Sequence, residues 1–479
     1  MSIVPCLPQE IFDGIIDFLY DDRGSLFACS LASPKFVATS RHHLFSETTL
    51  IFAKFYRLLE LLDAPWSSLA NTISRLVITG DDGHKTSGQA RLARKRALKL
   101  SGGVRKAYLP ENIPRVHERL QRVSSVRLSD ISPKDIPESF WTLLANMKGV
   151  KTVAAHRIGF QCPLSFFQFI TSLPLLEKLS VSRPTITTSA TQLAILQKQI
   201  CEGGGGGVNI LLPHPGTGPG FQMSLLDLRR TSQIPMLDQS LNASTVAGIA
   251  MLEWILVQIP RPSVKTLRLN LDYEHDMLNL LSKYFKAAGS QVENLCVVLP
   301  SCITALHDMS LIDLSPLTRI QHLHVEGLFM SHDPSAHVLE AFFRGFFAQI
   351  FSSSSLPMQN DAEVAAPPPL ISKITFTLTM DAKNELSFFG MPDHAILQTF
   401  TWFSLPSIIE EALGAFPETL HKLDVQLRVR STGISGREIG FSEDIIREGV
   451  WKRFTEQSRT LRVGFLPMLD RDGENDDLP

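Results

Sequence analysis

One apolar pattern recurs along most of this chain. It places apolar residues at positions one, four and six of a hexad, as in Ile73, Leu76 and Ile78. Because side chains of a strand alternate between its faces, positions four and six share one face, and the two residues flanking position four point to the other. Each hexad therefore predicts a short strand with one buried face. The fourth residues of the candidate hexads are Leu76, Val126, Val153, Leu179, Leu226, Leu267, Leu295, Leu323, Ile374 and Leu423.

The spacing of the hexads indicates a structural repeat. The fourth residues Val126, Val153 and Leu179 are 27 and 26 residues apart, and spacings of 28 separate Leu267 from Leu295 and Leu295 from Leu323. Periods of about 20 to 29 residues with one strand each are typical of leucine-rich repeats. The remaining spacings, which reach 51 residues between Leu323 and Ile374, indicate enlarged repeats or strands that the pattern does not reveal.

Helical segments are predicted between the hexads, at residues 112–121, 138–147, 165–171, 249–258, 277–287, 336–350 and 407–416. Alternating strands and helices at this period predict an α/β fold, a curved leucine-rich-repeat-like solenoid over residues 51–469. Insertions are expected near 81–110, 184–222 and 352–370, where a basic cluster, a glycine run and a Ser/Pro-rich stretch interrupt the pattern. Residues 470–479 form an acidic tail.

The first fifty residues follow a different pattern, which predicts three short helices. Ile11, Ile15 and Leu19 recur at helical spacing after Pro8, and a polar break at 21–24 separates them from a second apolar segment. Ser33-Pro34 starts a third segment. Three helices of this size bury little surface, so we expect a partner or the following domain to cover part of them.

These residues resemble an F-box, the motif that docks onto the Skp-type adaptor of a cullin-RING ubiquitin ligase. F-box sequences often carry a Trp-containing stretch in the third helix, where this chain has Phe36. The resemblance implies that residues 1–50 are an F-box-like helical module followed by degenerate leucine-rich repeats. It also implies an adaptor-binding surface made by Leu7, Pro8, Ile11, Ile15, Leu19, Leu26, Cys29, Leu31 and Phe36.

A second interpretation of the module stays open. The same apolar residues would also suit a helical cap, which the end of a solenoid needs for solubility. The chain would then be a leucine-rich-repeat scaffold or binding protein. The Leu7-Pro8 opening favours the docking interpretation.

Many residues that flank the buried strand positions are basic. Arg and Lys hold acidic or phosphorylated groups well, so this face predicts a target-binding surface for such groups. An equally good interpretation is that these charged side chains of the strands simply face solvent and bind no partner. The candidate target-binding residues are Arg75, Arg127, Lys178, Arg268, His322, His324, Lys373 and Lys422.

No catalytic, nucleotide-binding or metal-binding motif accompanies these patterns. His322 and His324 lie two apart on a predicted strand, but no third ligand is assured, so no metal or cofactor is assigned. A hydrolase stays open as a third class and would require a convergent polar cluster.

A net charge of −2 gives no global field for nucleic acid or anionic lipid. The six scattered cysteines suit a reducing compartment. We therefore expect a non-enzymatic substrate adaptor of an SCF-type ligase, with a cytoplasmic or nuclear location and no membrane association. Its partners would be a Skp-type adaptor, the cullin-RING complex and an unknown target.

Overall fold

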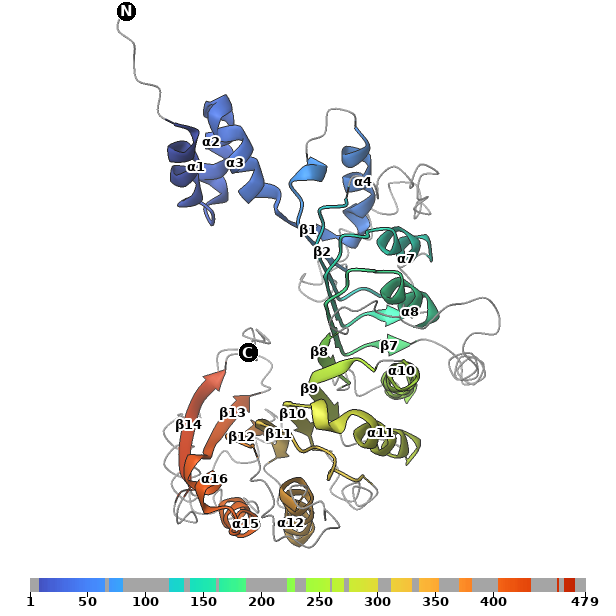
Figure 1. Ribbon diagram of the computed structural model, residues 1–479, viewed down its shortest axis with the longest axis vertical. Helices are drawn as coiled ribbons and strands as arrows, with labels where there is room; N and C mark the ends of the chain where they lie inside the picture. Colours follow the sequence, from blue (N-terminus) through green and yellow to red (C-terminus); the bar gives the residue numbers. More distant parts are fainter. Residues whose placement is uncertain are drawn as a thin grey trace, which may run out of the picture. The chain divides into compact units, whose positions relative to one another are not determined.

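The computed structural model describes fifteen stretches of the chain, shown in colour in Figure 1. They are residues 8–64, 69–80, 120–132, 138–160, 163–186, 222–228, 238–258, 261–270, 275–299, 312–329, 336–352, 370–380, 404–431, 455 and 461–469. Contacts divide the chain into two units, the first mainly up to Gln222 and the second mainly from Met223.

Three helices form the N-terminal module, as the sequence predicts. They are α1 (Gln9–Asp17), α2 (Arg23–Ala32) and α3 (Pro34–Phe45). The side chain of Asp22 accepts hydrogen bonds from the backbone N–H groups of Gly24 and Ser25 at 3.0 and 3.1 Å, which satisfies the free N–H groups at the start of α2. The hydroxyl of Ser33 caps α3 in the same way. Local capping thus fixes where α2 and α3 begin.

The module has a small core. Ile16, Leu26 and Leu44 are buried, one from each helix. Four partly buried side chains pack around them, namely Leu19, Cys29, Phe36 and Phe45. A core of this size leaves much of each helix uncovered.

The rest of the described chain alternates between strands and helices (Figure 1), and twelve of its strands form one sheet. Every strand pair with a determined register is parallel. In sheet order the strands are β1 (Glu47–Ile51), β2 (Arg75–Thr79), β3 (Ser125–Ser129), β4 (Thr152–His156), β6 (Lys178–Ser182), β8 (Gln222–Asp227), β9 (Ser263–Asn270), β10 (Asn294–Val298), β11 (His322–Phe329), β12 (Lys373–Met380), β13 (Asp424–Ser431) and β14 (Arg462–Leu469).

Nine of the ten predicted strand centres lie in these strands, and one hexad was placed wrongly. Ile374 of β12 pairs with Val425 of β13, so the true centre of that strand lies two residues beyond Leu423. Lys422, a candidate target-binding residue, is instead the last residue of helix α16 (Pro417–Lys422). The sequence pattern placed Lys422 beside Lys373 in the sheet, but the register neighbour of Lys373 is Asp424. The sequence pattern also missed β1 and β14.

The helices confirm most of the predicted segments. They are α4 (Phe55–Asp63), α7 (Glu138–Ala145), α8 (Pro163–Thr171), α10 (Asp238–Val257), α11 (His275–Ala288), α12 (Ala336–Ser352), α15 (Leu405–Ala412) and α16, with short 3-10 turns η1 (Phe52–Lys54), η2 (Leu69–Asn71) and η3 (Gly289–Gln291). None of the described helices is long and apolar enough to cross a membrane.

Several sequence predictions lie outside the described residues. They concern most of helix 112–121, the insertion near 81–110, most of those near 184–222 and 352–370, and the tail from residue 470. One boundary was wrong, because Thr185–Ile186 forms β7, which pairs with β5 (Gly159–Phe160) in a separate two-stranded sheet.

The repeat is visible in the backbone of the first unit. The carbonyl of Ser74 accepts from the N–H groups of Ser124 and Ser125, and equivalent bonds recur at the starts of the neighbouring strands. After β3, β4 and β6 the chain turns through a residue with positive φ, at Asp130, Arg157 and Arg183. Successive repeats therefore begin and end their strands at equivalent positions, which keeps neighbouring strands in register.

The two faces of the sheet differ sharply in polarity. Within the first unit, α7 and α8 cover one face of the sheet (Figure 1). The alternate strand residues Val126 and Leu128, and Val153 in the next strand, are fully buried. Within the second unit, Leu267, Leu295, Leu323, Ile374 and Val425 form one register row of buried apolar side chains. Along each strand, the residues that alternate with these buried positions point to the opposite side of the sheet. We call that side the polar face.

A glycine pair tests how tightly the repeats are packed. A Cβ at Gly80, which follows β2, would lie 1.8 Å from the carbonyl oxygen of Asp130, whereas a Cβ at Gly345 on α12 meets nothing within 4 Å. Gly80→Ala should lower stability by about 3 kcal/mol, because backbone must move to admit the methyl group. Gly345→Ala should raise it by about 0.5 to 1 kcal/mol, because alanine favours an exposed helix. Thermal unfolding of both variants checks this, and similar midpoints would contradict it.

Candidate functional site

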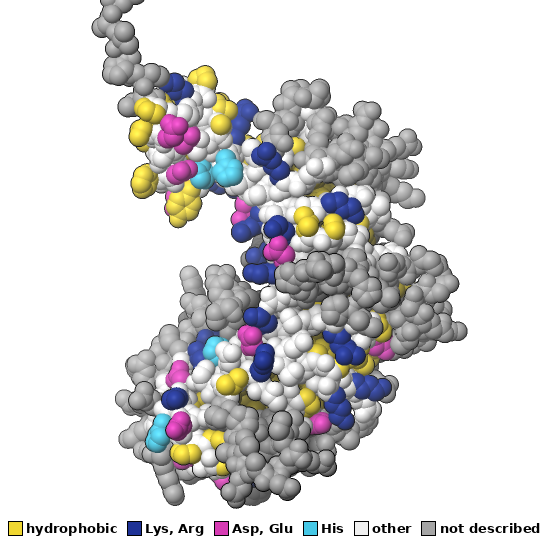
Figure 2. Space-filling model, viewed as in Figure 1, with side chains coloured by type: hydrophobic (Ala, Val, Ile, Leu, Met, Phe, Trp, Pro, Cys, Tyr) yellow, Lys and Arg dark blue, Asp and Glu magenta, His cyan; other side chains and the backbone are white. Residues whose placement is uncertain are grey.

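Helix α1 turns its apolar side chains outward. Ile11, Ile15 and Phe18 follow each other at helical spacing on one side of the helix and its C-cap, with exposed fractions of 50%, 52% and 87%. Tyr20, Phe27 and Leu31 are exposed as well. Figure 2 shows hydrophobic side chains at the surface of this module. We call the six residues Ile11, Ile15, Phe18, Tyr20, Phe27 and Leu31 the apolar stripes.

The opposite side of α1 holds the helix against α3 through polar contacts as well as through the buried Ile16. The amide of Gln9 donates to the backbone carbonyl of Lys35 at 2.8 Å, and the hydroxyl of Thr39 donates to the carboxylate of Asp13. The hydrogen bond from Thr39 lowers the pKa of Asp13, and a second bond, from the amide of Gln9 to the Asp13 carboxylate at 2.9 Å, lowers it further. The imidazole of His43 lies 2.7 Å from the carboxylate of Asp17 on the same side.

Helix α1 is thus apolar on its outer side as well as on its buried side, where Ile16 is only 1% exposed. A helix of a monomeric protein normally buries its apolar side and exposes its charges. Here Asp13 and Asp17 contact α3, while Ile11, Ile15 and Phe18 face away from it. Ile16 and Phe12 supply apolar contacts on the inner side, the ring of Phe12 lying 5.5 Å from that of Phe36. A partner surface would bury the exposed side.

The predicted adaptor-binding residues divide into three groups. Pro8, Ile11, Ile15 and Leu31 are exposed, Leu19, Cys29 and Phe36 are half-buried against the module core, and Leu26 is fully buried. Leu7 lies outside the described residues. The side chain of Leu26 thus supports the fold of the module and has no surface for a partner. The sequence prediction omitted Phe18, Tyr20 and Phe27, although their apolar character was the available signal.

The polar face of the first unit carries exposed basic residues. Arg75, Arg127 and Lys178, from β2, β3 and β6, are all exposed. The guanidinium of Arg75 lies 3.0 Å from the carboxylate of Glu47 on β1. In the parallel register, Arg127 lies between Val77 and Ala154, neither of which is charged.

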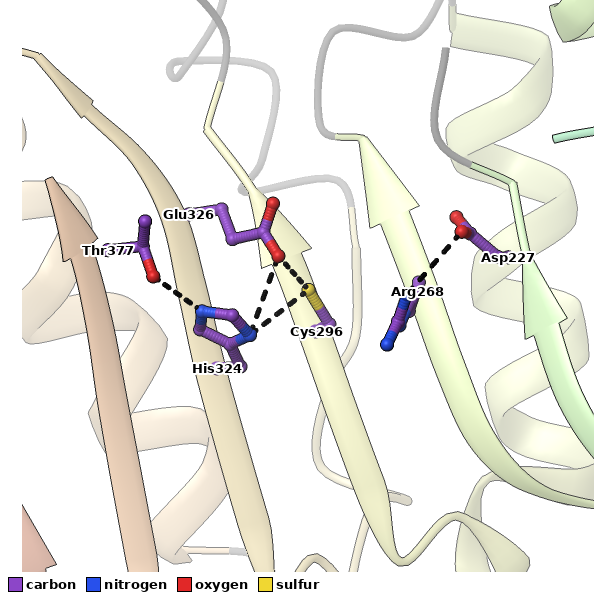
Figure 3. A network of polar contacts seen from close by, with 6 residues as sticks. All are labelled: Asp227, Arg268, Cys296, His324, Glu326 and Thr377. Atoms are coloured by element: carbon purple, nitrogen blue, oxygen red, sulfur yellow. Dashed lines mark hydrogen bonds and ion pairs between the residues drawn. The ribbon is translucent and has the colours of Figure 1, made fainter. Parts of the chain in front are cut away.

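In the second unit, several of the predicted residues belong to register rows across the sheet. His322 lies beside Asn294 and Lys373. Burial lowers the pKa of His322, and the positive charge of Lys373 lowers it further. Both side chains are half-buried. Figure 3 shows the next positions along the same strands, where the polar side chains contact one another.

Arg268 is placed on the polar face as expected, but it is only 5% exposed. Its guanidinium lies 3.8 Å from the carboxylate of Asp227 on β8, which is fully buried (Figure 3). A buried ion pair of this kind holds neighbouring strands together and offers little contact to a partner. The side chain is therefore unsuited to the target-binding role that the sequence suggested.

A cluster of four polar residues lies on the neighbouring strands. Cys296 of β10 pairs in register with His324 of β11, and Glu326 follows on the same side of β11. The Sγ atom of Cys296 lies 3.8 Å from Nδ1 of His324 and 3.4 Å from Oε1 of Glu326. Nε2 of His324 lies 2.7 Å from the hydroxyl of Thr377 on β12 (Figure 3).

This convergent cluster is of the kind that a hydrolase would require, but its geometry differs from that of a nucleophile relay. In such a relay, the two ring nitrogens of the histidine contact the nucleophile and the acid separately. Here Nδ1 of His324 faces both the thiol of Cys296 and the carboxylate of Glu326, at 3.8 and 3.5 Å. Three potential ligand atoms thus converge, which suits a metal ion.

The sequence contained a signal for this cluster that the pattern analysis missed. It considered His322 and His324 together, but within the described residues the atoms that converge belong to Cys296, His324 and Glu326. Cys296 and His324 are 28 residues apart, which is the repeat spacing of these strands. Aligning the repeats would therefore have placed the thiol beside the imidazole.

The ion pair in the second unit generates a stability prediction. Asp227→Ala should destabilise the protein by about 3 kcal/mol, because the buried guanidinium of Arg268 loses its facing carboxylate. Glu47→Ala removes an ion pair between half-exposed side chains and should change the unfolding midpoint far less. Chemical denaturation measures both, and equal effects would show that Arg268 is solvated.

Comparison with models of known protein families and with curated protein sequences finds no match for this chain. Its function is therefore argued from the exposed apolar side of α1 and from the polar face of the sheet.

Proposed function

We propose that this chain is a substrate adaptor of an SCF-type cullin-RING ubiquitin ligase. The module of α1, α2 and α3 docks onto a Skp-type adaptor through its apolar stripes, and the polar face of the repeats recruits a target protein. No bond chemistry is assigned to the chain. It acts by proximity, because holding a target near a loaded ubiquitin-conjugating enzyme raises the effective concentration of the target's lysines.

The observation that carries the docking proposal is the outward apolar side of α1. Nine large hydrophobic side chains are exposed among the described residues, and six of them are the apolar stripes of this small module. Large exposed apolar surface on a soluble domain marks a protein interface more often than a solvated surface. The resemblance of residues 7–36 to an F-box gives the partner class.

A helical cap on a leucine-rich-repeat scaffold is the competing function. A cap must bury its apolar residues against its own repeats. Ile16, Leu26 and Leu44 are buried against one another within the module, whereas Ile11, Ile15 and Leu31 remain at least half exposed. The exposed residues therefore favour docking over capping.

Target recruitment is assigned to Arg127 and Lys178 of the first unit. Both are exposed, Arg127 has uncharged register neighbours, and Lys178 lies beside Thr152 of β4. Arg75 contributes less, since Glu47 partly neutralises it. Exposed Arg and Lys that lack an acidic neighbour suit a target with acidic or phosphorylated groups.

The docking surface is tested with a double variant. Ile11→Glu with Ile15→Glu should weaken binding of a purified Skp-type adaptor by about 100-fold or more, because two anchor residues are replaced by charges at a buried interface. Leu61→Glu with Leu175→Glu is the matched control, since these leucines are similarly exposed outside the module. Calorimetric titration measures the affinities. Unchanged adaptor binding by the first variant, with an unchanged unfolding midpoint, would favour the scaffold function.

The target surface is tested separately by affinity purification from cells. Arg127→Glu with Lys178→Glu should retain the Skp-type adaptor and lose the bound target proteins, because the charge of the recruiting surface is reversed. Lys283→Glu with Lys286→Glu alters exposed charges on α11 and should lose neither. The proposal for Arg127 and Lys178 is wrong if both pairs of substitutions leave the same proteins bound.

A further inference from the structure

We propose that Cys296, His324 and Glu326 bind a zinc ion. The three residues project from the adjacent strands β10 and β11 on the polar face of the second unit (Figure 3). The site is separate from the apolar stripes and from Arg127 and Lys178. The proposal therefore stands independently of the ubiquitin-ligase function.

The distances between the ligand atoms match a tetrahedral metal site. Zinc bonds sulfur, nitrogen and oxygen at about 2.0 to 2.3 Å, which at tetrahedral angles requires ligand atoms about 3.3 to 3.6 Å apart. The Sγ of Cys296 and Oε1 of Glu326 are 3.4 Å apart, and this oxygen lies 3.5 Å from Nδ1 of His324. The third edge, between Sγ and Nδ1, is 3.8 Å. A shift of a few tenths of an ångström completes the triangle.

Thr377 presents the imidazole in the form that a metal needs. Its hydroxyl lies 2.7 Å from Nε2 of His324. When Nε2–H donates to this oxygen, Nδ1 carries a lone pair directed at the thiol and the carboxylate. A metal-bound histidine commonly makes such a hydrogen bond with its other ring nitrogen, which fixes the tautomer and the orientation of the ring.

Charge and burial favour a divalent ion over a simple hydrogen-bonded cluster. Cys296 is buried, and the side chains of His324 and Glu326 are only 16% and 13% exposed. A thiolate and a carboxylate together balance the two charges of Zn²⁺, so the occupied site is neutral where burying charge is costly. Without a cation, the carboxylate of Glu326 accepts from the thiol of Cys296 at 3.4 Å and faces Nδ1 of His324 at 3.5 Å, so a metal ion would take the place of protons at this point.

The ligand types distinguish zinc from the harder ions. Calcium and magnesium select oxygen ligands, whereas a thiolate with an imidazole is typical of zinc. The described residues supply three protein ligands. Zinc sites with three protein ligands hold a water molecule at the fourth position. Because the metal displaces protons from its ligands, its affinity should fall as the pH falls.

The test uses the full chain, freed of metal with a chelator and then titrated with Zn²⁺ against a chromophoric competitor. We expect one tight equivalent, and Co²⁺ in its place should give a cobalt–thiolate charge-transfer band with the intense visible spectrum of tetrahedral coordination. Cys296→Ser should remove the charge-transfer band, and His324→Gln and Glu326→Gln should weaken zinc binding by more than about 100-fold.

Matched controls exclude adventitious binding to other cysteines and histidines. Cys29→Ser replaces a partly buried thiol in the N-terminal module, and His322→Gln replaces a neighbouring imidazole on the same strand face. Both should bind zinc as the unaltered chain does. If these two substitutions reduce binding as much as those at Cys296 and His324, the assignment is overturned.

Thr377→Val keeps the shape of the side chain and all three ligands. It should weaken zinc binding by about 10 to 100-fold, because the hydrogen bond that orients His324 is lost. Zinc should also raise the unfolding midpoint of the unaltered chain and leave that of Cys296→Ser unchanged. Failure of the folded, metal-free chain to take up either zinc or cobalt would overturn the proposal, as would equal binding by a folded Cys296→Ser variant.

Discussion

The constant register of the parallel strands controls both the core and the surface of the repeats. Leu267, Leu295, Leu323 and Ile374 lie in one register row, and each is fully buried or nearly so. Burying a side chain of this size stabilises the fold by roughly 1.5 to 3 kcal/mol. A slip of one residue would carry such a row to the other face, so the apolar row strongly favours one register. The residues between these positions are thereby aligned on the polar face as well.

The sequence pattern placed nine strands correctly from their apolar hexads and misplaced the hexad centred on Leu423. It failed at both ends of the sheet order, where β1 and β14 have a neighbour on one side only. In β1 the register partner of Leu76 is Thr48, so the hexad is interrupted by a polar residue. In β13 the error arose because Leu420 and Leu423 are buried near the end of α16 and imitate a strand pattern. At this point of the sequence, leucines buried at the end of a helix cannot be told apart from leucines buried in a strand.

The orientation of α1 was not predictable from its apolar spacing. The helix has apolar residues on both sides, with Ile11 and Ile15 on one and Phe12 and Ile16 on the other. Which side faces α3 depends on the burial of Ile16 with Leu44 and on polar partners 26 residues away, including Thr39 for Asp13. Such contacts depend on the packed arrangement of the helices. The burial of Arg268 is unpredictable for the same reason, since its facing carboxylate comes from a different repeat.

The register also determines which charged residues have an oppositely charged neighbour in the sheet and which remain available to a partner. Where opposite charges meet across strands, as Asp227 and Arg268 do, the side chains can be buried because their charges balance. Arg127 lies between uncharged neighbours in its row and stays exposed. Recognition of an acidic target therefore requires rows whose charge is not balanced within the sheet. Rows that converge on several ligand atoms, as at Cys296, suit a metal ion, because the ion can replace the protons of the thiol and the imidazole.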